Sequence, residues 1–153
     1  MSLKLLYKKQ ENEYFCGPAI VQMILGSFGK KMSQRRLALL LKTNARTGTS
    51  NAALGRIIRK FGGYIDAHSQ GSLGEIRLHL RRGNPVIVNY REPEEDVGHF
   101  AIVVGITRSS IFLLDPWHGS RFRLSLTYFS SHWFGQFQGR SQQWLMAVSS
   151  KPL

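Results

Sequence analysis

Four segments in the first half of the chain repeat apolar residues at the three- and four-residue spacing of an amphipathic helix. The first begins at Cys16-Gly17, where Pro18 suits the first turn of a helix and the run from Ala19 to Leu25 continues it. Because apolar residues cover much of this helix, we expect it to be central and buried. The other three segments each begin with a serine that can cap a helix N-terminus: SQRRLALLLKT (33–43), SNAALGRIIRKFGG (50–63) and SLGEIRLHLRRG (72–83).

The second half of the chain changes to short, nearly continuous apolar runs that are typical of buried strands. We predict strands over 86–90 (VIVNY), 99–106 (HFAIVVGI) and 111–115 (IFLLD), the last two forming a hairpin. FRLSL (122–126) and WLMAVS (144–149) can add two more strands, with a short helix over 126–133 between them. Helices followed by a mostly antiparallel sheet predict an α+β fold, and 153 residues suit one domain over 1–153.

Composition narrows the classes of protein. Hydrophobic residues make up 42% of the chain, which indicates a folded domain, and a single cysteine cannot form an internal disulfide. No apolar run approaches the ~18–20 residues that span a bilayer, and the N-terminus lacks the apolar core of a signal peptide. We therefore expect a soluble, cytoplasmic protein.

The net charge of +12 raises the question of a nucleic-acid partner. Lysine and arginine are spread over several segments, however, and no helix-turn-helix, zinc or RNA-binding signature is present, so we expect no specific nucleic acid. The cysteine and the five histidines also lack metal-ligand spacing. Four of the nine acidic residues gather in EPEED, just before His99.

The lone Cys16 has two interpretations: a buried hydrophobe, or a nucleophile at a helix N-terminus, whose partial positive charge favours a thiolate. A nucleophile needs a base, and His99 is the best placed histidine because it opens the most apolar strand. A partly buried structural histidine is an equal alternative for that position. We expect His79 to be solvated on the charged part of its helix, and His68 and His132 to have surface roles.

Asp115, at the end of its strand, is the candidate carboxylate to orient His99, although Asp-Pro also favours a turn with no catalytic role. The hairpin register decides between these interpretations. A three-residue loop places Asp115 opposite Val103 and on the face of His99, whereas a two-residue loop turns it away. Even in the first register, roughly 13 Å along the strand separates the two residues unless a bulge shortens the gap. Simple counting places His118 or Gly119 opposite His99, which makes His118 the rival partner.

Two further residues are candidates for the site. Gln10 precedes Cys16 by six residues, and its amide is a possible oxyanion donor if the intervening loop folds tightly. The simpler interpretation is a surface glutamine in a polar stretch. Trp133 and Trp144 are expected in the core, whereas Trp117, which follows the Asp-Pro pair, is a candidate wall of a catalytic cleft.

Three segments together resemble the bacteriocin-processing cysteine peptidases, cysteine peptidase family thirty-nine of the papain-like clan: QENEYFCGPAIVQMIL, GHFAIVVGI and IFLLDPWHG. Their order is that of the family, and the resemblance extends over roughly Leu5 to Trp144. It implies a papain-like fold in which Cys16 is the nucleophile, His99 the general base and acid, Asp115 the orienter and Gln10 the oxyanion donor. It also implies peptide-bond hydrolysis through a thioester acyl-enzyme, with no metal or organic cofactor.

The chain departs from the family pattern in two respects. Phe15 stands immediately before the cysteine, where most members have an acidic residue. The best-known members are cytosolic front ends of ABC exporters that cut leader peptides after a double glycine, whereas this chain has no transmembrane or ATPase part. We therefore expect a standalone domain that acts on peptides or small proteins, with leader peptides as an analogy. A catalytically silent peptide-binding module on the same fold is the alternative, and a basic nucleic-acid-binding protein is a further one.

Overall fold

The computed structural model describes residues 3–135 and 142–153. Three helices come first along the chain: α1 (Cys16–Ser27), α2 (Gln34–Leu41) and α3 (Asn51–Lys60). They are followed by β1 (Tyr64–His68), α4 (Leu73–Arg81), β2 (Val86–Arg91), β3 (Gly98–Ile106), β4 (Ser110–Asp115), β5 (Gly119–Ser125), α5 (Leu126–His132) and β6 (Leu145–Ser149). Every predicted helix and strand is present within a few residues, and the predicted α+β class is confirmed.

Serine caps fix the starts of three of the helices at the predicted positions. Ser33, Ser50 and Ser72 each accept a hydrogen bond from the backbone N–H three residues later, at 3.1 Å. Such a cap satisfies a donor that the helix itself leaves unpaired, and is worth about 1 kcal/mol. These boundaries are therefore local features of the sequence.

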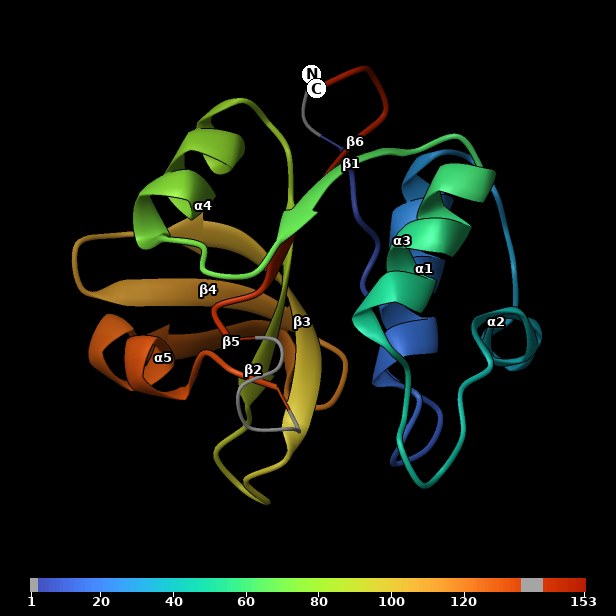
Figure 1. Cartoon of the computed structure of the whole chain (residues 1–153), viewed down its shortest axis with the longest axis horizontal. Helices are drawn as coiled ribbons and strands as arrows, with labels where there is room; N and C mark the ends of the chain where they lie inside the picture. The colour runs from blue at the N-terminus through green and yellow to red at the C-terminus, as the bar shows by residue number, and fades with distance from the viewer. Residues whose placement is uncertain (1–2, 136–141) are drawn as a thin grey trace.

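The described strands form one antiparallel six-stranded sheet in the order β1-β6-β2-β3-β4-β5. Helices α1, α2 and α3 lie on one side of this sheet, and α4 and α5 lie on the other (Figure 1). Side chains alternate between the two sides along each central strand. In β3, Phe100 and Ile102 pack toward α1–α3, whereas Ala101 and Val103 pack toward α4 and α5.

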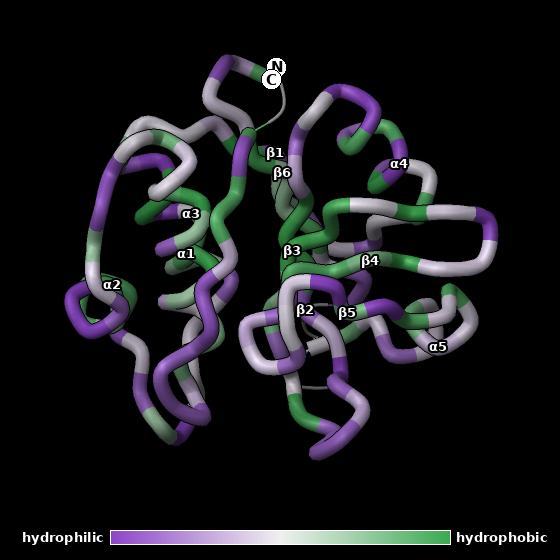
Figure 2. The backbone as a smooth tube through the Cα atoms, turned by 180° about the vertical axis from the view of Figure 1, so that it is seen from behind, coloured by the Kyte–Doolittle hydropathy of each residue, from purple (hydrophilic) through white to green (hydrophobic). Residues whose placement is uncertain are grey.

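The central strands carry the apolar residues of both cores. Figure 2 shows the hydrophobic stretch along β3, at the junction between the two groups of helices. Its neighbour β2 is fully buried from Val86 to Tyr90, which matches the continuous apolar run of the sequence. None of the helices built from the described residues has the length and apolar character needed to cross a membrane.

One strand, β1, was not predicted, and one histidine is placed differently from our expectation. This strand, YIDAH, lies at the edge of the sheet, paired with β6, and its side chains are partly exposed. Because an edge strand buries few side chains, its sequence shows only a weak apolar pattern. His79 was expected to be solvated, which is wrong: its side chain is buried, with Nε2 3.3 Å from Asp66 Oδ2 on β1. The unpredicted strand supplies the carboxylate that makes this burial tolerable.

A β-bulge sets the register of the β3–β4 hairpin. Near the turn, Gly105 pairs with Phe112, but beyond Val104 the pairing shifts, so that Val103 faces Leu113 and Ile102 faces Leu114. The turn itself has the short form, because Thr107 N–H donates to Ser110 O at 2.8 Å. Such a turn alone would direct Asp115 away from the histidine face. The extra residue at Val104 turns Asp115 back onto the face of His99 and shortens the separation of the two residues along the strands by one residue.

Candidate active site

Cys16 is the first residue of α1, where the chain turns into the helix. The carbonyl of the buried Phe15 accepts a hydrogen bond from Ala19 N–H at 3.0 Å, so the helical ladder starts immediately before the thiol. Gly17 lies against the loop that precedes α3: a Cβ on this residue would be 2.3 Å from Thr49 Oγ1. The absence of a side chain at Gly17 thus allows that loop to pack against the helix start, where Cys16 is half-buried.

His99 and Asp115 are hydrogen-bonded partners. His99 Nε2 lies 2.7 Å from Asp115 Oδ1, and both side chains are buried. Since a carboxylate can only accept, Nε2 is the protonated nitrogen, and Nδ1 is left to face Cys16. The rival partner His118 does not take the place of Asp115; its side chain instead lies 3.6 Å from a Glu92 carboxylate oxygen.

The Asp115 carboxylate is completely buried and is satisfied on both oxygens. Oδ1 also accepts from the backbone N–H groups of Trp117 (2.9 Å) and His118 (3.0 Å), so the Asp-Pro turn and the histidine contact coexist. Oδ2 accepts from the Tyr90 hydroxyl at 2.5 Å. Burial alone raises the pKa of Asp115, but the hydrogen bond and charge of His99, with the Tyr90 hydroxyl, lower it below its ordinary value.

Two tyrosines of the site were not predicted from the sequence. Tyr90 of β2 donates to the Asp115 carboxylate, and Tyr7 donates to the Asp115 backbone carbonyl at 2.6 Å. Burial and the neighbouring Asp115 charge raise the pKa of both hydroxyls, so both remain donors. In the sequence, Tyr90 is one member of an apolar strand and Tyr7 lies in a basic stretch, so neither position signals this contact.

Cys16 and His99 are hydrogen-bonded partners, and each shifts the pKa of the other. Burial raises the pKa of the Cys16 thiol, but the hydrogen bond to His99, the charge of that imidazole and a backbone hydrogen bond from Phe100 lower it overall. Burial also lowers the pKa of His99, whereas its contacts with Asp115 and Cys16 outweigh this and raise the pKa to about 10. These directions favour a thiolate beside an imidazolium at neutral pH.

The segment that carries Gln10 is fixed against the same turn. Gln10 N–H donates to Pro116 O at 3.0 Å, and its side-chain Nε2 donates to Asn12 O at 2.8 Å. Gln34 of α2, a residue not singled out in the sequence, accepts from Glu11 N–H at 3.0 Å and donates to Lys9 O at 2.9 Å. Gln10 is therefore buried beside the Asp-Pro turn rather than exposed on the surface.

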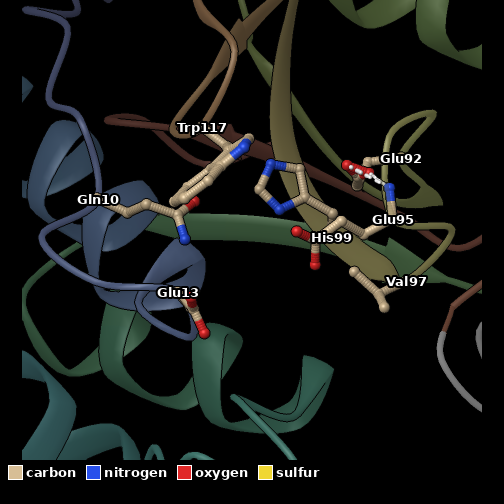
Figure 3. Close-up of a pocket in the computed structure, with 7 residues that line it drawn as sticks. All are labelled: Gln10, Glu13, Glu92, Glu95, Val97, His99 and Trp117. Carbon is tan, nitrogen blue, oxygen red and sulfur yellow. Dashed lines mark hydrogen bonds between the residues drawn. The ribbon is translucent and has the colours of Figure 1, made fainter.

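A pocket opens beside the imidazole of His99. Six of the side chains around it come from three parts of the chain: Gln10, Glu13, Glu92, Glu95, His99 and Trp117. Figure 3 shows Gln10 and Trp117 on one side of His99 and the glutamates of the β2–β3 loop on the other. Trp117 is 37% exposed, whereas Trp133 and Trp144 are buried, as their sequence contexts predicted. Within residues 3–135 and 142–153, no group of three His, Cys, Asp or Glu residues is placed to hold a metal ion.

Comparison with known proteins gives matches over most of the chain. The family model of the peptidase C39 family matches residues 4–137. The lactococcin-A transport/processing ATP-binding protein LcnC of Lactococcus lactis is 30% identical over 131 residues, which are 84% of this chain and 18% of that protein. The chain thus spans less than a fifth of the length of this relative.

Two solved structures share the fold. The peptidase domain of Streptococcus ComA, a bifunctional ABC transporter involved in quorum sensing, has a TM-score of 0.73 at 20% identity and covers 97% of this chain and 100% of that one. A double glycine motif protease from an AMS/PCAT transporter, in complex with its leader peptide, has a TM-score of 0.69 at 14% identity, with coverage of 96% and 92%. The expected papain-like fold is confirmed, and by the match of its family model this chain belongs to the peptidase C39 family.

Proposed function

We propose that this protein is a thiol-dependent endopeptidase in which Cys16 is the nucleophile, His99 the general base and acid, Asp115 the orienter and Gln10 the oxyanion donor. The observation that carries the proposal is the continuous chain of contacts from the thiol through the imidazole to the buried Asp115 carboxylate. Its elements come from α1, β3 and β4, which are far apart in sequence. Membership of a peptidase family supports the same reaction class.

The proposed reaction uses each group in turn. The Cys16 thiolate attacks the carbonyl carbon of the scissile peptide bond, and the resulting oxyanion accepts a hydrogen bond from the second N–H of the Gln10 amide. The His99 imidazolium then gives its Nδ1 proton to the leaving amine, and a thioester remains on Cys16. Neutral His99 next takes a proton from water as that water attacks the thioester, which releases the carboxylic acid product and restores the thiolate–imidazolium pair.

We further propose that the substrates are peptides or small proteins and that the physiological reaction is removal of a leader peptide. Two similar proteins support this: the lactococcin-A relative is described as a transport and processing protein, and the double glycine motif protease was solved with a leader peptide. The net charge of +12 would favour binding of an acidic leader segment to the basic surface of the protein outside the pocket.

The first test is the rate of Cys16 alkylation by iodoacetamide across a pH series, read by intact mass. An unperturbed thiol reacts with an inflection near pH ~8.5. Because its pKa is lowered, Cys16 should react well below that pH, and because the imidazolium persists to a pKa of about 10, a second change should appear on the alkaline side. His99→Ala should abolish the reaction at low pH, whereas His68→Ala, a change in an exposed histidine, should leave the profile unchanged.

The outcome of the alkylation series separates the peptidase from the silent peptide-binding module. A Cys16 that is inert, or that reacts like a free thiol in both wild type and His99→Ala, contradicts the proposed mechanism. The protein would then be a binding module on a peptidase fold.

A second test addresses the reaction itself. A peptide with two consecutive glycines before the scissile bond should be cleaved by the wild type, and mass spectrometry should locate the cut after the second glycine. Cys16→Ala removes the nucleophile and should abolish this cleavage, while a peptide with alanines in place of the glycines should be cut more slowly. Cleavage that continues in Cys16→Ala would rule out the thiol mechanism.

A further inference from the structure

The pocket beside His99 is acidic, although the protein as a whole is strongly basic. The chain has 21 lysines and arginines against nine acidic residues, yet three of the seven residues lining this pocket are glutamates, none is a lysine or arginine, and His99 is the one basic side chain among them. The basic side chain of Arg91, which precedes Glu92, is paired with a different carboxylate, since its Nε lies 3.2 Å from Asp96 Oδ1. The glutamates therefore create a local negative potential next to Cys16 and His99, although the net charge of the protein is positive.

The loop between β2 and β3 holds its acidic side chains in place. Glu92 is buried, and its carboxylate accepts the backbone N–H groups of Glu94 at 2.9 Å and Glu95 at 2.8 Å, which fixes the turn of the loop. Figure 3 shows the Glu95 carboxylate directed beneath His99, with Glu13 across the pocket on the segment before α1. Within the part of the chain that the structure describes, neither Glu13 nor Glu95 makes an ion pair.

A second, independent feature also calls for a donor. Gln10 is only 5% exposed and lines the same pocket, and its side-chain Oε1 is a buried acceptor with no hydrogen-bond partner among the described residues. Such a group costs free energy until a donor reaches it. Trp117 adds an aromatic face at the pocket edge, of the kind that attracts cations.

The reactive groups do not cancel this field. A Cys16 thiolate and an Asp115 carboxylate carry two negative charges against the single positive charge of His99, so the three together are net negative. A cation in the pocket would thus face carboxylates, an unpaired amide oxygen, an aromatic face and a net negative reactive centre.

We propose that this pocket binds the cationic side chain of a lysine or arginine in the peptide substrate, at a residue flanking the scissile bond. The inference rests on the proposed peptidase function for its place in the reaction, since the pocket is defined by its position next to His99. Glu13 and Glu95 supply the charge, Gln10 Oε1 accepts an N–H from the bound group, and Trp117 covers its methylene chain or its charge. A substrate with an uncharged residue at this position would lose these contacts and leave Gln10 Oε1 unpaired.

The test is binding of N-acetyl-lysinamide, compared with its uncharged analogue N-acetyl-norleucinamide, to ¹⁵N-labelled wild-type protein at low salt. The readout is the indole N–H signal of Trp117 in a two-dimensional NMR spectrum, assigned by its loss in Trp117→Phe. We expect a saturable shift with the lysine compound and none with the norleucine compound. Glu13→Gln and Glu95→Gln should each weaken the lysine binding about threefold, a typical size for a solvated charge contact.

Glu11→Gln is the matched control, because it removes the same charge from the same segment at an exposed residue that does not line the pocket. It should leave the binding unchanged, and the remaining amide signals show that each variant is folded. Equal shifts with both compounds would show that the pocket recognises the aliphatic chain and not the positive charge, which contradicts the proposal. The absence of any Trp117 shift, or equal weakening by Glu11→Gln, would also overturn the proposal.

This test does not depend on turnover. If Cys16 proves unreactive while the lysine compound still binds at Trp117, the peptidase function fails and the cationic pocket stands. If Cys16 is reactive and the lysine compound does not bind, the peptidase function stands and the cationic pocket fails. For an active enzyme, the corresponding result is a higher kcat/KM for a peptide with lysine in this position than for one with norleucine, and loss of that difference in Glu95→Gln.

Discussion

At the scale of single residues, the Asp115 carboxylate organises the site. It is completely buried, accepts hydrogen bonds from both sides, and holds His99 with Nε2 protonated toward it. A buried charge is tolerable only when each oxygen is satisfied. The Tyr90 hydroxyl therefore adds to the lowering of the Asp115 pKa, after the larger effect of His99.

Tyr90→Phe should destabilise the protein and shift the reactivity of the thiol. Loss of a hydrogen bond to a buried charged group costs roughly 1.5–3 kcal/mol, and the pKa of Asp115 should rise. A less firmly ionised Asp115 supports the His99 imidazolium less well, so the alkaline change in Cys16 alkylation should move to lower pH. Urea unfolding and the alkylation series measure the two effects.

Tyr128→Phe is the control for this change, because the Tyr128 hydroxyl donates to Arg91 O at 3.0 Å and makes no contact with Asp115. It should leave the alkylation profile in place. If the two substitutions shift the profile equally, Tyr90 has no particular role at the carboxylate.

At the scale of the elements, the start of α1 depends on close packing with the loop before α3. Thr49 Oγ1 occupies the space next to Gly17 and lies 2.7 Å from Thr43 Oγ1, a contact that holds the α2–α3 loop together where it packs against the turn that carries Cys16. The position of the thiol thus depends on this close packing at the helix start. A side chain at Gly17 has nowhere to go without moving the helix or the loop.

Gly17→Ala should destabilise the fold by about 1–3 kcal/mol, the usual cost of overpacking. Gly26→Ala, in the same helix, is the matched control: a Cβ there meets nothing within 4 Å, and alanine is the better helix former by up to ~1 kcal/mol. Thermal or urea unfolding of the two variants gives the comparison. Opposite signs are expected, and equal effects would contradict the packing argument.

At the scale of the whole molecule, the sheet separates two cores, and the site draws on both: Cys16 packs against the α1–α3 core, whereas Tyr90 belongs to the core on the α4–α5 side. Phe129 and Trp133 belong to the core on the α4–α5 side, with ring centroids 5.1 Å apart. Trp133 Nε1 also donates to Trp144 O at 2.9 Å, which ties α5 to the segment before β6. Cytoplasmic location, a single domain over 1–153 and the lack of a specific nucleic-acid partner remain predictions at this scale.

Because Trp133 lies in the core and does not line the pocket, Trp133→Ala should lower stability strongly and leave the chemistry of the folded protein nearly unchanged. Emptying a buried tryptophan site costs about 3–5 kcal/mol. Trp117→Ala, at a partly exposed tryptophan of the pocket, should show the reverse: little loss of stability and weaker use of substrate. Urea unfolding measures the stability of the two variants, and peptide cleavage measures their activity. A similar loss of stability and of cleavage in Trp117→Ala would make Trp117 a core residue.

Much of the fold was determined by short-range patterns. The starts of α2, α3 and α4 follow from serine caps, and the buried strands follow from apolar runs, because both signals act within a few residues. Cys16, His99, Asp115 and Gln10 were likewise identified by motifs in their order along the chain. The strand β1 and the burial of His79 were not, since a weakly apolar edge strand becomes recognisable only through its pairing with β6.

The tertiary structure decided which of these groups meet. A one-residue bulge at Val104 brings Asp115 onto the face of His99, although the short turn by itself points it away, and a slip of one residue has little local signature. Tyr90 contacts the carboxylate of Asp115, which lies 25 positions later in the chain. Gln34 contacts the backbone of Lys9, next to Gln10, which lies 25 positions earlier. The sequence by itself determined the candidates and their elements, because these depend on local patterns; their assembly depended on register and long-range packing, which no local pattern encodes.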